Sequence, residues 1–196
     1  MYHYVETKGK ARAPLVFTFH GTGGSPEQFH GFASQLIPDA HVVSPQGDVS
    51  EGGMARFFRR TGEGIYDMPD LAQRRATMRA FMTEQIAALK PERVIGLGYS
   101  NGANILAAVM LDGPRIVDQA ALLHPLIPWT PAPNAALRDV EVLITAGRRD
   151  PICPAPLTQD LADYLASQKA TATLLWHSGG HDIAQSELDA VRHMVG

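Results

Sequence analysis

Val94-Ile-Gly-Leu-Gly-Tyr-Ser-Asn-Gly102 is the stretch that decides the fold: an apolar run leads into a serine that has a glycine two residues away on either side. The next residues, Ala103-Asn-Ile-Leu-Ala-Ala-Val-Met110, favour a helix. The pattern therefore predicts a strand that turns directly into a helix, with Ser100 at the turn. Such a turn has a strained backbone, and a side chain two residues before or after the serine would collide with it. Gly98 and Gly102 remove those side chains.

A strand, a central serine and a helix in this order are typical of the nucleophile elbow of α/β-hydrolases, where the serine Oγ projects above the sheet. A Gly-x-Ser-x-Gly string also arises by chance, so the prediction depends mainly on the flanking strand and helix. The same glycines fit a loose dinucleotide-binding turn, which requires an acidic residue about 20 positions further on. That place holds Leu122-Leu-His124, which argues against a nucleotide site.

Length and composition indicate an ordinary globular protein. The chain has 196 residues, enough for a full core, and we expect a single domain over residues 1–196. With 45% hydrophobic and 19% charged residues, the composition is not that of a disordered chain. The net charge of −3 leaves no basic surplus to neutralise phosphates, so nucleic acid is not an expected partner.

Cysteine usage and the N-terminal composition bear on location. Cys153 is the only cysteine, so it cannot form an internal disulfide, and we expect a reduced, cytoplasmic setting. Residues 1–7 do not show the basic and apolar regions of a signal peptide. No stretch approaches the roughly 18 consecutive apolar residues of a membrane span. The sequence leaves a homodimer open.

Further strands and helices alternate along the chain. Segments rich in β-forming residues predict strands at 2–7 (an edge strand), 15–19, 40–44, 119–123, 140–146 and 172–176. Helices are expected at 26–37, where Ser25 would be the N-cap, and at 69–89, 155–168 and 182–194. This alternation predicts the α/β class and an α/β-hydrolase fold: one doubly wound, mostly parallel sheet of about seven strands flanked by helices, with no large lid.

Two loops are candidates for substrate contacts. His20-Gly-Thr-Gly-Gly24 directly follows a strand, and its glycines allow main-chain N–H groups to bind an oxyanion, although a plain connector is the competing interpretation. Segment 52–66 is expected to be a long loop over the active face. The aromatic candidates for a pocket are Phe57, Phe58, Tyr66 and Trp129. Arg59 and Arg60 are expected to pair with Glu63 and Asp67 rather than with substrate.

Six chemistry-bearing residues lie at or just beyond predicted strand ends: His20, Ser100, His124, Asp150, His177 and His181. Because the carboxyl ends of parallel strands meet at one edge of a sheet, these residues can converge. Acyl transfer needs a nucleophile, a histidine base and a carboxylate that orients the base, in the chain order Ser, Asp, His on this fold. Ser100, Asp150 and His181 satisfy that order.

Other histidines compete for the role of base. His177 ends its strand, whereas two glycines give His181 freedom to reach across the sheet, so His181 is preferred. His20 precedes the serine and is expected to shape the donor loop. Asp182 is better interpreted as an N-cap of the last helix. No metal is expected, because the segment between His177 and His181 is not helical and no Cys/His cluster exists.

Four motifs in order carry a family resemblance: Phe19-His-Gly-Thr-Gly-Gly24, Gly98-Tyr-Ser-Asn-Gly-Ala103, Ala146-Gly-Arg-Arg-Asp-Pro-Ile-Cys-Pro154 and Gly179-Gly-His-Asp182. With them the chain resembles, over about residues 14–195, the phospholipase/carboxylesterase family of small α/β-hydrolases, which includes the acyl-protein thioesterases. Segment 56–70 and the phrase Leu123-His-Pro-Leu-Ile-Pro128 look closer to its bacterial carboxylesterases.

The resemblance implies roles for individual residues. Ser100 would be the nucleophile, His181 the base and Asp150 the orienting acid, with the main-chain N–H groups of Thr22 and Asn101 as oxyanion donors. The other expected pocket residues are His20, Gly23 and Ile152. Asn101 stands where the thioesterases typically carry glutamine, which leaves the backbone donor in place but puts the pocket shape in doubt.

The sequence thus favours a cofactor-free serine hydrolase that cleaves small or medium carboxylic esters through an acyl-enzyme on Ser100. One alternative keeps the same residues but acts on a thioester or a lysophospholipid. Another belongs to a different class, a non-catalytic protein that holds a small ligand in a hydrolase-like pocket. The sequence does not identify the natural substrate or its acyl-chain length.

Overall fold

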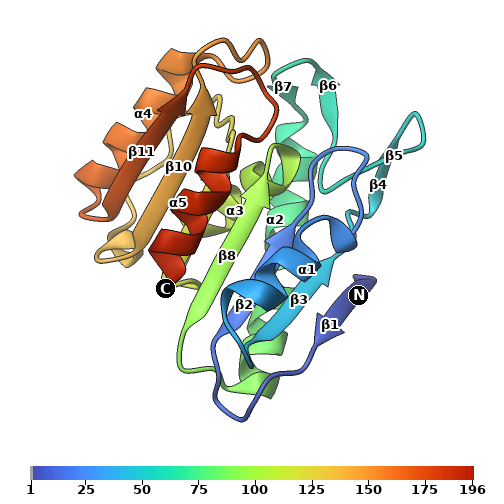
Figure 1. Ribbon diagram of the computed structural model, residues 1–196. Helices are drawn as coiled ribbons and strands as arrows, with labels where there is room; N and C mark the ends of the chain where they lie inside the picture. The colour runs from blue at the N-terminus through green and yellow to red at the C-terminus, as the bar shows by residue number, and fades with distance from the viewer. Residues whose placement is uncertain (1) are drawn as a thin grey trace.

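One seven-stranded sheet organises the computed structural model, which describes residues 2–196 (Figure 1). Its strands are β1 (Tyr4–Thr7), β2 (Leu15–Phe19), β3 (His41–Pro45), β8 (Val94–Tyr99), β9 (Gln119–Leu123), β10 (Glu141–Gly147) and β11 (Thr171–His177). Their spatial order is β1-β3-β2-β8-β9-β10-β11, and only β1 runs antiparallel to its neighbour. The predicted mostly parallel sheet of an α/β-hydrolase is confirmed.

Within residues 2–196, five α-helices cover the two faces of the sheet. They are α1 (Glu27–Leu36), α2 (Met68–Leu89), α3 (Asn101–Leu111), α4 (Ala155–Ser167) and α5 (Gln185–Val195), with a 3-10 turn at Ala135–Leu137. In Figure 1, α1 and α5 lie in front of the sheet, and α2 and α3 lie behind it. Because helices cover both faces, the central strands β2 and β9 are buried along their whole length.

Successive residues of β2 show how the core is divided. Phe17 and Phe19 belong to the large apolar cluster that includes α3, whereas Val16 packs with Ala33 of α1 on the opposite face. Alternation along the strand therefore supplies both layers. The carboxyl ends of the parallel strands all point to one edge of the sheet, which is where the polar strand-end residues collect.

The segment predicted as one long loop is instead two small hairpins. Strand β4 (Val49–Glu51) pairs with β5 (Met54–Arg56), and β6 (Arg60–Gly62) pairs with β7 (Ile65–Tyr66). The first hairpin turns at Gly52 and Gly53, whose φ angles of +58° and +85° suit glycine. The prediction missed this because three-residue and two-residue strands are too short to show a period.

Two predicted helix caps were wrong. The Ser25 hydroxyl donates to the Glu27 carboxylate at 2.6 Å, and α1 begins after Pro26 without a side-chain cap. Asp182 lies before α5, which begins at Gln185. Instead, the side chain of Glu187 inside α5 accepts the N–H of Ala184 at 2.6 Å. A carboxylate three residues into a helix can satisfy the same free N–H groups as an N-cap.

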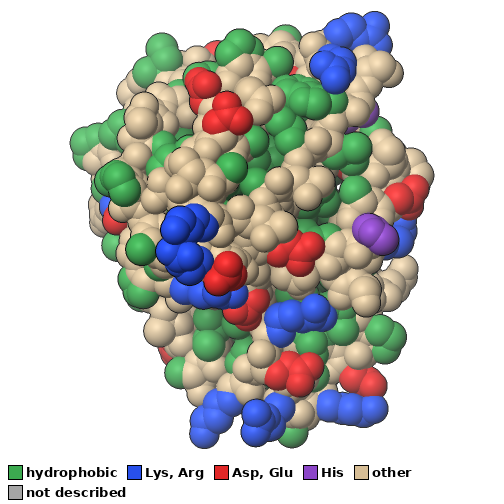
Figure 2. Space-filling model, turned by 90° about the vertical axis from the view of Figure 1, so that its left-hand side faces the viewer, with side chains coloured by type: hydrophobic (Ala, Val, Ile, Leu, Met, Phe, Trp, Pro, Cys, Tyr) green, Lys and Arg blue, Asp and Glu red, His purple; other side chains and the backbone are tan. Residues whose placement is uncertain are grey.

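The surface carries charges of both signs. In the face shown in Figure 2, basic and acidic side chains are interspersed over the surface rather than gathered into one field. No helix within residues 2–196 combines the length and the apolar character needed to cross a bilayer.

Candidate active site

The turn between β8 and α3 holds Ser100 in a strained conformation. Its φ and ψ angles are 51° and −119°, a region that residues with a Cβ seldom occupy. A Cβ at Gly98 would lie 2.7 Å from the amide nitrogen of Ala103, and one at Gly102 would collide with the carbonyl of Phe19. The predicted steric reason for both glycines is therefore confirmed.

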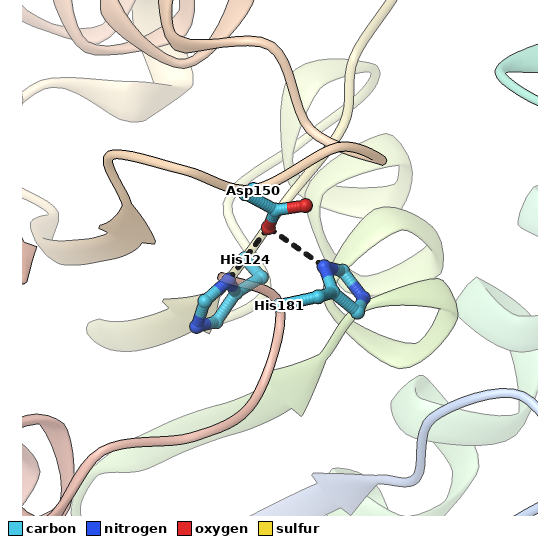
Figure 3. Close-up of side chains that lie close together, drawn as sticks. All are labelled: His124, Asp150 and His181. Atoms are coloured by element: carbon cyan, nitrogen blue, oxygen red, sulfur yellow. Dashed lines mark hydrogen bonds and ion pairs between the residues drawn. The ribbon is translucent and has the colours of Figure 1, made fainter. Parts of the chain in front are cut away.

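Three loops at the carboxyl edge of the sheet bring Ser100, His181 and Asp150 together. His181 Nε2 lies 2.9 Å from Ser100 Oγ. On the other side of the ring, His181 Nδ1 lies 2.7 Å from Asp150 Oδ2 (Figure 3). These residues follow β8, β11 and β10 respectively. With Nδ1 donating to the carboxylate, Nε2 is free to accept the serine proton, which is the arrangement that acyl transfer requires.

Asp150 is held by the turn that carries it. Its Oδ1 accepts the N–H groups of Ile152 at 2.8 Å and Cys153 at 3.0 Å, and its side chain has no exposed surface. Burial by itself raises the pKa of Asp150, but the hydrogen bonds from His124, His181 and these two amides outweigh it, so the pKa is lowered overall. Asp150 is therefore charged at neutral pH.

Two main-chain donors lie beside the serine. Within residues 2–196 the N–H groups of Thr22 and Asn101 have no protein acceptor, and both residues line the cavity that contains Ser100. The N–H of Asn101 is at the first position of α3, where the helix dipole favours negative charge. These two N–H groups could bind an oxyanion next to Ser100.

Residues in and next to β5 form hydrogen bonds with the two segments that carry the N–H groups of Thr22 and Asn101. Arg56 donates from Nη1 to Thr22 Oγ1 at 2.7 Å, and Gly23 donates its N–H to the carbonyl of Ala55 at 2.9 Å. The N–H of Phe57 donates to Asn101 Oδ1 at 2.7 Å. One short segment therefore fixes the donor loop and the start of α3 together, and this contact gives the asparagine side chain a structural role.

The cavity beside Ser100 has a volume of about 280 Å³. Its lining residues are Thr22, Arg56, Arg60, Glu63, Gly64, Tyr66, Tyr99, Ser100, Asn101, Asn104, Leu126, Ile152, Cys153 and His181. Arg60 is paired with Glu51 at 2.8 Å and with Glu63 at 2.9 Å, so its charge is compensated. Arg59 pairs with Asp70 at 3.9 Å rather than with Asp67. Arg56, the other cation of the wall, lies 3.3 Å from Glu51, so the charges that line the cavity are largely compensated.

Only some of the expected pocket residues line the cavity beside Ser100; the others border different hollows or lie in the core. Tyr66 and Ile152 line the cavity. Trp129 stands edge-on behind Tyr66, with ring centroids 6.3 Å apart, and borders a different hollow against α4. Gly23 borders another shallow groove, near Gly47. The pocket assignments of Trp129 and Gly23 are therefore corrected.

Three further pocket assignments are corrected because the side chains are buried. Phe57 and Phe58 have no exposed surface and pack in the large core cluster. His20 is also buried: its Nδ1–H donates to the carbonyl of Gly21 at 2.7 Å, and its Nε2 accepts the N–H of Gly47 at 2.9 Å. Burial lowers the pKa of His20. This ring therefore contacts the backbone of Gly21 and Gly47. Its predicted part in shaping an oxyanion-donor loop stays a prediction.

Sequence reasoning missed the position of a second imidazole on the same carboxylate. His124 Nδ1 lies 2.8 Å from Asp150 Oδ2, the oxygen that His181 also contacts (Figure 3). His124 was recognised only as one of several strand-end residues. No local sequence pattern marks this position of His124, because its other partner, Glu187, lies on a helix 63 positions further along the chain.

Within the described residues, two groups of three side chains have ligand atoms close enough to hold a metal ion: His124, Asp150 and His181, and His124, His177 and Glu187. In both groups the nitrogen and oxygen atoms hydrogen-bond to one another. These bonds account for the proximity of the side chains without an ion. No metal is assigned to either group.

Comparisons with known proteins extend over nearly the whole chain. The family model described as "Dienelactone hydrolase family" matches residues 4–190. Atu2452 of Agrobacterium tumefaciens str. C58 superimposes with a TM-score of 0.95 and 50% identity, over 98% of this chain and 94% of that one. The Bacillus cereus carboxylesterase does so with a TM-score of 0.90 and 34% identity, over 98% and 92%. MhqD of Bacillus subtilis (strain 168) is 34% identical over 180 residues, 91% of this chain and 90% of that protein.

Proposed function

Because the chain belongs to the dienelactone hydrolase family, we propose that it is a serine hydrolase that cleaves carboxylic esters within a single catalytic domain. The observation that carries this proposal is the relay from Ser100 Oγ through His181 to Asp150, with spacings of 2.9 and 2.7 Å. The similarity of the chain to the Bacillus cereus carboxylesterase supports the same reaction class.

The mechanism follows from this geometry. Ser100 Oγ attacks the ester carbonyl while His181 Nε2 takes the hydroxyl proton, and Asp150 holds the imidazole and stabilises its charge. The N–H groups of Thr22 and Asn101 bind the oxyanion. His181 then protonates the leaving alcohol, and water activated by the same ring releases the acid. None of these steps requires a cofactor.

The cavity favours small or medium acyl groups. A volume of about 280 Å³ lies at the lower end for small-molecule sites, and the wall carries Arg56, Arg60 and Glu63. A long lipid chain would leave these charged side chains against apolar surface, which is unfavourable. We therefore place esters of small or medium acyl groups ahead of lysophospholipids and long-chain thioesters. Closer kinship with the phospholipase/carboxylesterase family, a cytoplasmic location and a homodimer stay predictions.

The decisive experiment compares the natural protein with Ser100→Ala on p-nitrophenyl esters of increasing acyl length, with acyl-CoA and lysophospholipid as competing substrate classes. Alanine keeps the Cβ and the strained turn, so only the hydroxyl is lost. We expect the variant to lose roughly three orders of magnitude or more in kcat. A fluorophosphonate probe should label the natural protein and not the variant.

This design also separates catalysis from simple ligand binding. A non-catalytic binding protein would resist the probe, and its slow background hydrolysis would not change with the serine substitution. Preference for acyl-CoA or lysophospholipid over every short ester would reassign the substrate while keeping the same three residues.

A further inference from the structure

Asp150 is shared by two imidazoles, only one of which reaches the nucleophile. His181 and His124 contact the same oxygen, Oδ2, at 2.7 and 2.8 Å from different sides (Figure 3). The side chain of His181 is 17% exposed, whereas that of His124 is 0% exposed. The proposed mechanism uses the first ring and leaves the second unexplained.

Both ring nitrogens of His124 face a carboxylate. Nδ1 lies 2.8 Å from Asp150, and Nε2 lies 3.0 Å from Oε1 of Glu187 in α5. The side chain of Glu187 has no exposed surface. An unprotonated ring nitrogen facing a carboxylate would place two lone pairs together in a buried site, which costs free energy. Nε2 of His177 also lies 3.4 Å from Nε2 of His124, but it is 3.3 Å from Oε2 of the same carboxylate and donates there. Each nitrogen of His124 therefore carries a proton, and the ring is a cation.

The hydrogen bonds around Glu187 agree with this assignment. Its Oε1 also accepts the hydroxyl of Thr145, and its Oε2 accepts the N–H of Ala184. His177 Nε2 lies 3.3 Å from Oε2, and Nδ1 of that ring accepts the N–H of Gly179 at 3.1 Å, so the proton of His177 is on Nε2. Every polar atom of the carboxylate is satisfied as an acceptor, so Glu187 is itself charged.

Given the ester hydrolase function proposed above, we propose that His124 is a positioning residue that stays protonated between Asp150 and Glu187. The positive charge of its ring limits how strongly the Asp150 carboxylate holds a proton on His181. Together the cluster carries one net negative charge: two carboxylates and one imidazolium. The imidazolium fixes the orientation of the shared carboxylate and withdraws part of its charge from the catalytic ring.

The surroundings of His124 are consistent with a cation. The titratable groups that face it from neighbouring elements are Asp150, Glu187, His177, His181 and Tyr99, and the Cys153 thiol donates to its carbonyl. Burial alone lowers the pKa of His124, but the hydrogen bonds to Glu187 and Asp150 outweigh burial, so the pKa is raised overall. Burial raises the pKa of Glu187, but its bonds from His124 and Thr145 lower it below the usual value.

Glu187→Gln isolates the effect, because it keeps the size and the contacts of the side chain. Without the second carboxylate, His124 becomes neutral and accepts from the new amide, while Nδ1 still donates to Asp150. The cluster keeps a net charge of −1, but that charge is now concentrated on Asp150. His181 then binds its proton more tightly, and the acid limb of the kcat/KM profile moves to higher pH.

The experiment has two independent readouts on the full chain. The first follows the ring nitrogens of His124 by ¹⁵N NMR between about pH 5 and 9. Near neutral pH both should be protonated in the natural protein, and only one should be protonated in Glu187→Gln. The second compares kcat/KM profiles, with an expected upward shift of the acid limb of about half a pH unit or more. Asp189→Asn is the matched control, since it removes an exposed carboxylate of the same helix.

Each outcome decides the proposal. A neutral His124 in the natural protein, or a stoichiometric bound metal that disappears in Glu187→Gln, would overturn it. So would superimposable pH profiles with only a lower Tm, because a purely structural role predicts that result. If the natural protein shows no Ser100-dependent hydrolysis, the proposed function and the catalytic part of this inference fail, while the NMR readout still decides whether His124 is a cation.

Discussion

The two sides of Asp150 use the same type of residue in opposite ways. On the open side, His181 borders the cavity and lies next to a single carboxylate, which fits the proton transfer proposed for it. On the closed side, His124 is buried between two carboxylates and keeps its proton. Solvent access and the number of charged neighbours, rather than residue type, therefore decide the protonation behaviour of an imidazole.

The largest effect is expected on the open side. His181→Gln should lower kcat by about 10⁴-fold or more, because no other ring reaches Ser100 Oγ. The free energy of unfolding should change by less than about 1 kcal/mol, since the ring is partly exposed and contacts a single carboxylate. Steady-state kinetics and urea unfolding measure the two quantities. A loss of less than tenfold in kcat would mean that another group serves as base.

The closed side should show the opposite pattern. His124→Asn removes the only cation between two buried carboxylates, so the free energy of unfolding should fall by about 3 to 4 kcal/mol. The loss in kcat should stay below about 100-fold, because Ser100 and His181 remain paired. Urea unfolding and kinetics at one pH measure both. If His124→Asn left the free energy of unfolding unchanged and lowered kcat more than His181→Gln does, His124 rather than His181 would be the ring needed for the reaction.

A milder change on the closed side tests whether its hydrogen bonds act together. Thr145→Val keeps the shape of the side chain but removes a donor to the Glu187 carboxylate. The free energy of unfolding should fall by about 1.5 to 3 kcal/mol, the usual range for a bond to a charged group. Activity near neutral pH should change little. A loss of activity as large as that of His124→Asn would show that the hydroxyl itself orients the site.

The smallest expected effect is in the pH dependence of stability. Folding lowers the pKa values of Asp150 and Glu187. Their contribution to the free energy of unfolding is therefore present above their pKa values in the unfolded chain, near about pH 4, and is lost as pH falls through their pKa values in the folded protein. The pKa of His124 is raised, so its contribution is complete below about pH 6.5 and is lost as pH rises through the folded value. Stability should therefore be highest between these limits. Calorimetric Tm values at several pH values should fall less steeply on the acid side for Glu187→Gln.

The fold could be predicted well from the sequence because its main signals are local. Strands β2 and β9 lie where the apolar runs indicate, and the glycines around Ser100 predict the turn correctly. The order of Ser, Asp and His along the chain was enough to select residues that the structure brings within hydrogen-bond distance. These features depend on residues that are neighbours in sequence or on a general rule about strand ends.

The remainder could not be predicted because it depends on contacts between distant segments. The aromatic character of Phe57 and Phe58 is compatible with a pocket wall and with a core, and only the packing of the hairpins decides for the core. The Gly52-Gly53 pair was a usable sign of the first hairpin. The link from His124 to Glu187 had no local sign, since a glutamate inside an amphipathic helix normally faces solvent.

The strained serine has a consequence for evolution in the laboratory. At φ 51° and ψ −119° the backbone of residue 100 prefers a residue without a Cβ, and such strain costs of order 1 to 3 kcal/mol. Glycine would relieve it, and only part of the gain would be cancelled by the greater freedom of the unfolded chain. A library screened for heat resistance alone would therefore be expected to enrich variants that have lost the Ser100 hydroxyl, the nucleophile of the proposed reaction. Any such screen needs an activity filter at every round.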